Sequence, residues 1–518
     1  MKKGGYMIEE NKSSMKNSVR RLIIAGIGVL IQIIWVVVLL MRLNEYSQII
    51  TLLTVAIELV LVLAVYSMDT NAAFKLPWII LITVAPIVGI CVFFLFGRSG
   101  ATKKVRARYR KIDQQLFAYL NQDEQIIEEL SKKDERLAND FKYLWKCASS
   151  PVYKNTDVKY YGDTCDAMAA QLEDMMQAKK FIFLEYHAIE MAESFQALRK
   201  VLMAKAREGV EIRILYDDAG CIGFLNPRFI KYMESMGIQC RVFNPIMPVL
   251  NIFMNNRDHR KITVIDGKVA YTGGYNLADE YFNITHPYGQ WKDSGIRFEG
   301  DAVQTATILF LEMWNALREQ DVDIEKYLPV YPYKAKEQGF FALYGDSPLD
   351  KEPAGENVYM NLLRHAKKYI YFTTPYLILS DEMTRELTGA AKRGVDVRII
   401  TPGIPDKKTI FQVTKSYYPQ LLKHGVKIYE YTPGFMHEKQ CICDGEIVVV
   451  GTINLDFRSL YLHFENAALF CGYEAVSHVK EDFEALFPIC KDMSKEPSER
   501  TRRLRLSQLI LRLFSPLM

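Results

Sequence analysis

The sequence predicts an α/β protein with two duplicated βαβ sandwich domains that share one site, preceded by N-terminal transmembrane helices. Three observations predict this class. Long apolar runs lie before residue 97. After about residue 150, short apolar strands alternate with amphipathic helices, a pattern typical of a largely parallel sheet covered by helices. The same alternation then occurs again, with matching sequence.

Residues 1–97 are predicted to be a membrane region with two or three transmembrane helices. Its apolar runs cover residues 22–41, Ile49–Tyr66 and Pro77–Phe96, each long enough to span a bilayer. Basic residues flank the region on both sides, which favours an even number of crossings, although three runs are present. The sequence leaves this conflict open. We expect a multi-pass protein of the cell membrane with its large C-terminal part in the cytoplasm.

Composition narrows the function classes. Hydrophobic residues make up 49% of the chain and charged residues 24%, so the chain is ordered rather than disordered. Its 9 cysteines are odd in number and lack metal-ligand spacing, which fits a reducing compartment and no disulfide framework. The net charge of +4 gives little sign of the broad basic surface of a nuclease, so no nucleic-acid partner is expected.

Matching segments define the duplication. "AKKFIFLEY" at Ala178–Tyr186 corresponds to "AKKYIYFTTPY" at Ala366–Tyr376. "AREGVEIRILYD" at Ala206–Asp217 corresponds to "AKRGVDVRIITP" at Ala391–Pro402. The offset of about 185 residues is too long for a solenoid and suits two domains. The expected boundaries are a helical linker at 98–149, the first domain at 150–325, an inter-domain linker at 326–356, the second domain at 357–492 and a basic amphipathic tail at 493–518.

One motif, H-x-K-x4-D-x6-G-x2-N, occurs once in each copy. A lone histidine is most simply a structural residue. Here five residue types recur in register in a chain with only 8 histidines, which favours a functional site built twice. The candidate catalytic residues are His259, Lys261 and Asp266 in the first copy and His437, Lys439 and Asp444 in the second.

These residue types suit phosphoryl chemistry. Side chains at i and i+2 of a strand share a face, so each histidine emerges beside its lysine. One neutral imidazole can attack phosphorus, while the other, protonated, donates to the leaving alcohol. Lysines and asparagine amides can hold the phosphate oxygens. Asn276, Asn454, Gly274 and Thr452 are therefore candidate phosphate-binding residues. No Asp/His cluster has metal spacing, so neither a metal nor another cofactor is expected.

The motif aspartates have a second interpretation. Asp266-Gly267 and Asp444-Gly445 each precede an apolar strand, which predicts hairpin turns. We therefore expect both aspartates to be turn residues first and not catalytic bases.

Other polar residues are candidates for supporting roles. A nucleophilic histidine needs an acceptor on its second ring nitrogen, and Asp293 and Glu465 follow the two motifs at similar distances. A surface carboxylate is the competing interpretation, and it is stronger for Asp293. Glu185 and Tyr376 end matched strands and are expected to line the pocket. Arg458 either touches phosphate or braces Asp456, and bracing is favoured.

The doubled motif resembles the phospholipase D superfamily. From about residue 50 to 518 the chain further resembles the bacterial cardiolipin synthases, on the segments "DHRKITVIDGKVAYTGGYN", "GQWKDSGIRFEG", "TTPYLILSDE" and "GTINLDFRSLYLHFE". The resemblance implies two phospholipase D-like lobes with one active site at their pseudo-two-fold interface. It implies transfer of a phosphatidyl group between two phosphatidylglycerol molecules, with release of glycerol, through a phosphohistidine and without metal. On this basis His259 is the expected nucleophile and His437 the general acid.

Two departures from the family pattern stand out. Gly274 occupies a position where a serine is usual, so one hydroxyl contact to phosphate is expected to be missing. The apolar run at 22–41 is additional to the usual pair.

Two other function classes compete with a phosphatidyltransferase acting on phosphatidylglycerol and anionic membrane lipid. A membrane-anchored phosphodiesterase, either a phospholipase or a nuclease, would use the same pocket with water as acceptor. A non-catalytic lipid scaffold is disfavoured because both motifs keep every reactive residue type. The C-terminal segment "TRRLRLSQLILRLFSPLM" predicts either an interfacial helix or a docked one. A homo-oligomer stays open, although two copies in one chain form the site without it.

Overall fold

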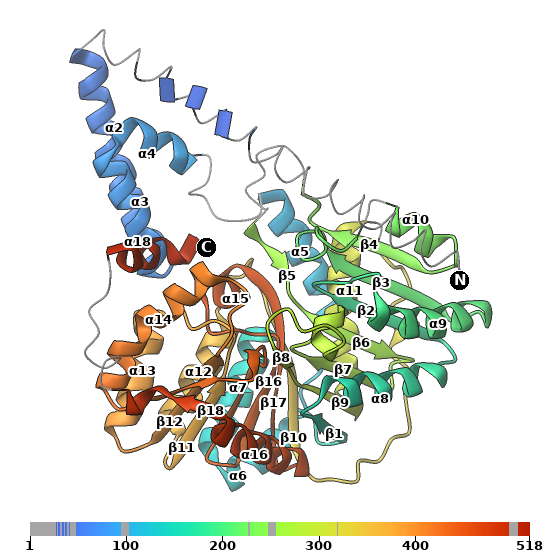
Figure 1. Cartoon of the computed structure of the whole chain (residues 1–518). Helices are drawn as coiled ribbons and strands as arrows, with labels where there is room; N and C mark the ends of the chain where they lie inside the picture. The colour runs from blue at the N-terminus through green and yellow to red at the C-terminus, as the bar shows by residue number, and fades with distance from the viewer. Residues whose placement is uncertain are drawn as a thin grey trace.

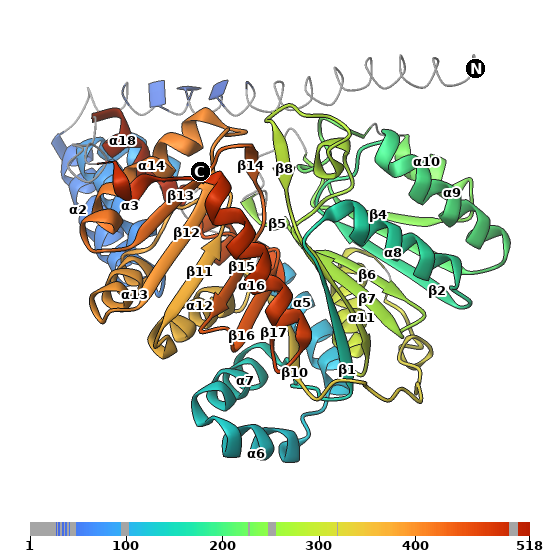
Figure 2. The ribbon, with the colours of Figure 1, turned by 60° about the horizontal axis from the view of Figure 1, so that its bottom comes forward.

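Two mixed β-sheets lie side by side in the computed structural model (Figure 1). The structure describes residues 48–94, 103–225, 228–246, 255–318, 320–496 and 506–517, with scattered positions between 27 and 41. Figure 2 shows the two lobes next to each other, the first in green and the second in orange and red.

The first sheet has the strand order β1-β9-β7-β6-β2-β3-β4. Only β2, β3 and β4 run parallel, because the Asp266-Gly267 turn folds β6 and β7 into an antiparallel hairpin. The expected largely parallel sheet is therefore mixed. Its strands are β1 (Thr156–Tyr161), β2 (Phe181–Tyr186), β3 (Glu211–Asp217), β4 (Gln239–Phe243), β6 (Lys261–Ile265), β7 (Val269–Gly273) and β9 (Gly295–Gly300).

The second sheet repeats this plan, with the order β10-β17-β16-β15-β11-β12-β13-β18. The strands β11, β12 and β13 are parallel, and β15 and β16 form the matching hairpin. Its strands are β10 (Phe340–Asp346), β11 (Tyr369–Thr373), β12 (Asp396–Pro402), β13 (Lys427–Tyr431), β15 (Gln440–Cys443), β16 (Ile447–Gly451), β17 (His463–Cys471) and β18 (Cys490–Asp492).

Helices cover the outer faces and also fill the space between the sheets. The outer face of the first sheet carries α8 (Thr164–Met176), α9 (Glu193–Arg207) and α10 (Phe229–Glu234). The outer face of the second carries α6 (Glu124–Lys133), α7 (Glu135–Ala148), α12 (Ala354–His365), α13 (Asp381–Lys392) and α14 (Lys408–Lys423). The shared core between them contains α5 (Lys103–Leu116), α11 (Val303–Leu317) and α16 (Glu474–Leu486).

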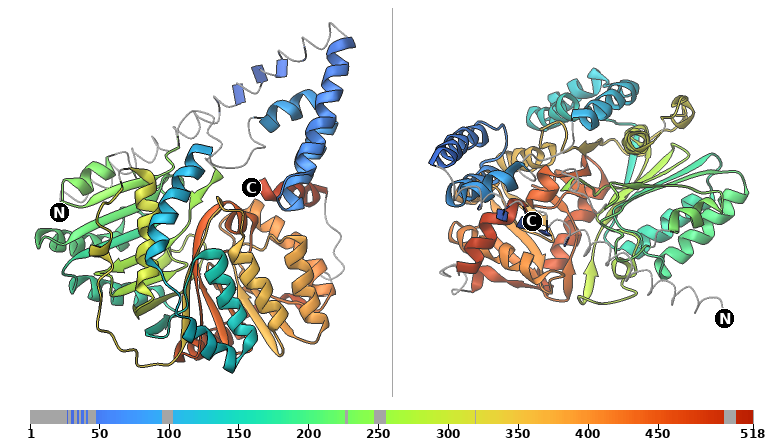
Figure 3. Two further views of the ribbon diagram at one scale, coloured as in Figure 1. Left: turned by 180° about the vertical axis from the view of Figure 1, so that it is seen from behind. Right: turned by 90° about the horizontal axis from the view of Figure 1, so that it is seen from above.

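Two expected linkers are structural parts of the lobes. In the range 98–149, α5 buries Tyr109 and Ile112 in the shared core and lies beside α11 (Figure 3, left). The range 326–356 contains β10, which pairs with β17 along its whole length. The continuous apolar run "FFALY" makes this strand, which is buried on both faces, although the proline-rich and glycine-rich residues around it predicted a linker.

Two short parallel pairs join the lobes to each other. β5 (Arg257–Asp258) of the first lobe pairs with the start of β17 in the second. β14 (Gly434–Met436) of the second lobe pairs with β8 (Gln290–Lys292) of the first. The strands β5 and β14 each end at the residue immediately before a motif histidine. The two lobes are thus interlocked at the positions where the motifs begin.

The N-terminal apolar runs form helices that pack on the second lobe. The run at Ile49–Tyr66 coincides with α2 (Gln48–Tyr66). The run at Pro77–Phe96 is divided between α3 (Ala72–Val84) and α4 (Pro86–Val92), because Pro86 disfavours helical geometry at Ala85. More than half of the run at 22–41 lies outside the described residues. Within the part of the chain that is described, no helix is long and apolar enough to cross a membrane.

Candidate active site

Each motif histidine is held in place by the opposite lobe. His259 follows β5, and its backbone N–H donates to the carbonyl of Phe464 at 2.9 Å. His437 follows β14, and its N–H donates to the carbonyl of Lys292 at 2.8 Å. The interlocking strands therefore bring both histidines to the interface between the lobes.

The carboxylates that orient the histidines are exchanged between the lobes. Nδ1 of His259 lies 2.9 Å from Oε2 of Glu465, and Nδ1 of His437 lies 2.6 Å from Oδ2 of Asp293. Sequence order associated Asp293 with the first motif and Glu465 with the second. The structure pairs them the other way, because β5 lies along β17 and β14 lies along β8.

A buried lysine accompanies each histidine. Nζ of Lys261 donates to the carbonyl of His259 at 2.6 Å, and Nζ of Lys439 donates to the carbonyl of His437. Burial lowers the pKa of Lys261 to about 8 and the pKa of Lys439 to about 7. The charged form of each lysine is therefore costly without an anion, which prepares the site for a phosphate.

Burial and both lysines hold the pKa of His259 and of His437 well below the ordinary value. Each imidazole is therefore neutral near pH 7 in the free protein. With Nδ1 donating to a carboxylate, the lone pair on Nε2 is left for an electrophile. Burial also raises the pKa of Asp293 to about 7. Nζ of Lys439 also lies 2.8 Å from Nδ1 of His437, whereas Nζ of Lys261 contacts the carbonyl of His259 and not its ring. The two carboxylate–histidine pairs therefore have different surroundings.

The residues at positions 274 and 452 distinguish the two halves further. The Thr452 hydroxyl donates to Oε2 of Glu465 at 2.5 Å, so it supports the carboxylate that orients His259. At Gly274 an added Cβ would lie 2.0 Å from Oδ1 of Asp293. A side chain at position 274 would therefore displace the carboxylate that orients His437.

Comparison with known proteins agrees with this geometry. A family model described as "Cardiolipin synthase, PLD-like domain" matches residues 172–314 and 359–487, one match in each lobe. The chain is 32% identical to a cardiolipin synthase of Halalkalibacterium halodurans, over 85% of this chain and 87% of that protein. It is 31% identical to cardiolipin synthase 2 of Bacillus anthracis, over 86% of each. The chain belongs to the cardiolipin synthase family.

A solved structure supports the fold of this family member. Phosphatidylserine synthase of Haemophilus influenzae superposes with a TM-score of 0.53 at 14% identity, over 70% of this chain and 93% of that one. At this identity the likeness concerns the fold alone. The predicted α/β architecture with two duplicated phospholipase D-like domains is confirmed by the family matches and by the two sheets.

The motif aspartates lie in hairpin turns, so their grouping with the catalytic residues is corrected. Asp266 and Asp444 have φ of 54° and 53°, each followed by a glycine with positive φ. The Asp266 carboxylate accepts the backbone N–H groups of Lys179, Lys180 and Phe181 at 2.8, 2.7 and 2.9 Å. Asp444 does the same for residues 367–369. Both carboxylates tie a hairpin to the start of the neighbouring strand.

The candidate asparagines differ in what they contact. Asn276 accepts from the N–H of Ala188 at 3.1 Å and donates to the Tyr281 hydroxyl at 2.8 Å. Its amide is therefore engaged with the protein. Oδ1 of Asn454 is buried and has no hydrogen-bond partner among the described residues. A phosphate oxygen needs a donor, so the unpaired acceptor of Asn454 does not itself favour phosphate binding, and phosphate contact stays a prediction for both asparagines.

The three remaining candidates lie around the histidines. Glu185 is fully buried, and burial together with Asp258 holds its pKa far above the ordinary value, so it lies within the lobe and does not line an open pocket. The Tyr376 hydroxyl donates to Asp406 at 2.6 Å. Nε of Arg458 donates to Nε2 of His463 at 3.2 Å, so its side chain braces a histidine instead of Asp456.

Sequence reasoning missed two further histidines. The rings of His187 and His463 lie 5.0 and 5.7 Å from the ring of His259. Four of the chain's 8 histidines therefore gather at this interface, including His437. Histidine is scarce in this chain, and this scarcity is the sequence signal that could have marked His187 and His463 as candidates, as it did for the two motif histidines.

One group in the described part of the chain could hold a metal ion, namely His259, His463 and Glu465, with ligand atoms within 4.8 Å of one another. The tautomer of His463 argues against this use. Because Arg458 donates to its Nε2, the neutral ring carries its proton on Nδ1, the atom that faces Glu465. His463 thus presents a donor to Glu465, and the residues do not fit a metal.

Proposed function

We propose that the protein is a cardiolipin synthase, which transfers a phosphatidyl group from one phosphatidylglycerol to another and releases glycerol. The observation that carries this proposal is the pair of buried histidines, each oriented by a buried carboxylate of the other lobe. Family membership supports the phosphatidyltransferase activity and the lipid class.

In the first step Nε2 of His259 attacks phosphorus and forms a phosphohistidine. The bond from phosphorus to the leaving glycerol oxygen breaks, and His437 supplies a proton to that oxygen. Because His437 is neutral in the free protein, it takes up this proton from solvent when the anionic phosphate binds and raises its pKa. Lys261 and Lys439 hold the phosphate oxygens, and the bound anion restores the charge of both lysines.

In the second step the hydroxyl of another phosphatidylglycerol gives its proton to His437 and attacks phosphorus. The bond between phosphorus and His259 breaks, cardiolipin leaves, and both histidines return to their starting protonation states. The cycle needs no metal, because the protein supplies the nucleophile, the acid and the cations.

We further propose that α2, α3 and α4 attach the catalytic lobes to the cell membrane, with those lobes on the cytoplasmic side. Large apolar side chains of these helices are exposed in the structure, including Leu52, Leu59, Val60, Leu63, Leu76 and Val84. The helix α18 (Leu506–Phe514) docks on α14 through Gln508 and Arg512, yet it exposes Leu506, Leu509 and Ile510. One face of α18 is thus docked on the protein, as the docked interpretation of the C-terminal segment requires. The other face is exposed and apolar, as an interfacial helix requires.

The deciding experiment is product analysis. Purified full-length protein is incubated with phosphatidylglycerol in mixed micelles without added metal. We expect cardiolipin and glycerol, and turnover lowered at least about 1,000-fold in His259→Ala and in His437→Ala. The exposed His478→Ala is the matched control and should keep normal turnover. Phosphatidic acid with glycerol would instead make water the acceptor and the protein a hydrolase.

A further inference from the structure

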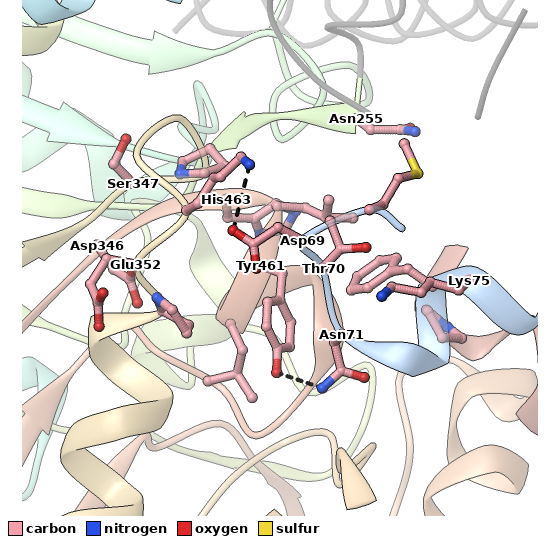
Figure 4. Close-up of a pocket in the computed structure, with 18 of the residues that line it drawn as sticks. Asp69, Thr70, Asn71, Lys75, Asn255, Asp346, Ser347, Glu352, Tyr461 and His463 are labelled. Atoms are coloured by element: carbon pink, nitrogen blue, oxygen red, sulfur yellow. Dashed lines mark hydrogen bonds and ion pairs between the residues drawn. The ribbon is translucent and has the colours of Figure 1, made fainter. Parts of the chain in front are cut away.

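A cavity of about 520 Å³ lies between the N-terminal helices and the second lobe (Figure 4). Its walls come from the turn between α2 and α3, from the loop 346–353, and from α15 (Phe457–Tyr461) with the start of β17. The α3 helix is fixed there, because Asn71 donates to the Tyr461 hydroxyl at 3.1 Å and Phe74 packs edge-on against the Tyr461 ring. The cavity is thus a built feature of the contact between these parts.

One side of the cavity is apolar and comes mainly from the N-terminal helices. Val65, Met68, Phe74 and Trp78 line it, together with Leu462. The Trp78 ring is held edge-on against Phe93 at 5.6 Å. The same two helices carry the exposed apolar side chains that we assigned to the membrane. The apolar wall of the cavity therefore lies on helices that we expect to contact lipid.

The cavity is also lined by cations without acidic partners among the described residues. Nε of Arg106 is buried and has no hydrogen-bond partner in that part of the chain. Lys75 donates to the carbonyl of Tyr66 at 3.1 Å, and none of the described carboxylates accepts from it. Arg106 and Lys75 therefore offer charge and donors to an anion.

The acidic residues of the cavity have partners other than Arg106 and Lys75, and one of these partners, Lys351, also lines the cavity. Asp69 lies 3.7 Å from Lys351, and Glu352 accepts from the Tyr143 hydroxyl at 2.7 Å. Asp346 accepts the backbone N–H of Gly355 at 2.7 Å, and burial holds its pKa well above the ordinary value. Among the described residues, no hydrogen bond or ion pair joins one of these carboxylates to Arg106 or Lys75.

We propose that this cavity binds an anionic glycerophospholipid at a site separate from the reaction centre, with the phosphate at Arg106 and Lys75 and the acyl chains along Trp78 and Phe74. This inference rests on the proposed function in one respect, namely that the reacting lipid binds at His259 and not in this cavity. His463 lines the cavity and faces Glu465, at 3.7 Å between Nδ1 and Oε1. Only the His463 side chain therefore separates an occupant of the cavity from Glu465, the carboxylate that orients His259.

Trp78 makes the proposal measurable without turnover. Full-length His259→Ala protein in phosphatidylcholine micelles is titrated with phosphatidylglycerol that carries brominated acyl chains, and tryptophan fluorescence is recorded. The same titration of a Trp78→Phe variant is subtracted, since the chain has 5 tryptophans. We expect saturable quenching from Trp78, and none above background with brominated phosphatidylcholine.

Charge variants decide whether the cations bind the phosphate. Arg106→Gln and Lys75→Gln should each weaken the Trp78 quenching by phosphatidylglycerol about tenfold. Arg110→Gln, an exposed arginine of the same helix that does not line the cavity, should leave it unchanged. Two independent variants guard against a folding defect in one, and thermal melting checks each.

Three outcomes would overturn the inference. Equal quenching by brominated phosphatidylcholine would remove the role of the anion. Unchanged affinity in both Arg106→Gln and Lys75→Gln would remove the phosphate contact. Binding of inorganic phosphate without quenching by brominated phosphatidylglycerol would make the cavity a site for free phosphate. Because His259→Ala does not turn over, absence of cardiolipin in the product assay would refute the proposed function and leave this measurement unaffected.

Discussion

At the scale of single residues, the exchange of carboxylates between lobes is the central feature of the site. Glu465 and Asp293 are fully buried beside histidines of the opposite lobe. Each histidine therefore depends on the packing of a domain other than its own. A substitution at either carboxylate should act on the reactivity of a histidine far from it in sequence.

Glu465→Gln tests this exchange. The amide keeps the size of the side chain but cannot stabilise charge that develops on His259 during attack. We expect kcat to fall about 10–100-fold and the yield of trapped phosphohistidine at His259 to fall with it. Mass spectrometry of rapidly quenched reactions measures this yield. Asp293→Asn should act through His437, which also takes the proton of the incoming alcohol, so breakdown of the phosphohistidine should slow in this variant. A normal rate of breakdown in Asp293→Asn would contradict the assignment.

Gly274→Ser tests why the first copy lacks a hydroxyl residue. The Cβ of a serine at this position would lie 2.0 Å from Oδ1 of Asp293. We expect the carboxylate to be displaced from His437 and kcat to fall at least about tenfold, with little change in KM. Thr452→Ser is the control, because it keeps the hydroxyl that bonds Glu465. Faster turnover in Gly274→Ser would show instead that a phosphate contact had been missing.

At the scale of elements, the motif combines two different tasks. Its His-Lys half belongs to the site, and its Asp-Gly half closes a hairpin and caps the neighbouring strand. The same carboxylate contacts occur in both lobes, at Asp266 and Asp444. The motif is therefore one supersecondary unit whose two ends serve chemistry and stability separately.

Asp266→Ala should destabilise the protein without removing its chemistry. Three backbone N–H groups lose their acceptor, so the free energy of unfolding should fall by about 2–4 kcal/mol. Thermal melting measures this change, and kcat per folded molecule should stay within about threefold of normal. Asp266→Asn keeps one acceptor oxygen and tolerates positive φ, so it should lose less. Loss of kcat in a folded Asp266→Asn protein would restore a catalytic role to this residue.

At the scale of the whole molecule, the interface between the lobes buries four basic side chains, and burial disfavours the charged form of each of them in the free protein. Lys261 and Lys439 are buried together with two imidazoles, and burial lowers the pKa of Lys439 to about 7. In the free protein Lys439 therefore loses its proton as pH rises through about 7. A bound phosphate favours the charged form and raises this pKa again.

Substrate binding should therefore take up protons above pH 7. The affinity for phosphatidylglycerol should be greatest below the free pKa of Lys439 and should fall as pH rises from about 7 to 9. Calorimetry of His259→Ala protein in buffers of different ionisation enthalpy measures the proton uptake. Lys439→Met should lower both the affinity and the uptake. Affinity that does not change with pH in the unsubstituted site would contradict the predicted role of Lys439.

The sequence by itself determined the duplication, the strand-turn pattern and the residue types of the site. Periodicity and turn residues are local signals, and the repeated motif made two histidines and two lysines conspicuous. It also placed Asp266 and Asp444 in turns, because Asp-Gly favours positive φ within two residues. Only the tertiary structure decided which carboxylate faces which histidine, because that depends on β5 and β14 pairing with strands of the opposite lobe.

Packing between distant segments likewise decided the rest. No local pattern links His463 to His259 or brings Trp78 and Arg106 around one cavity, because these residues meet only when the N-terminal helices dock on the second lobe. The strand β10 was hidden among proline and glycine residues, and its pairing with β17 made it part of the sheet. Sequence specified the chemistry available to this protein, and the contacts between its two lobes decided where each group acts.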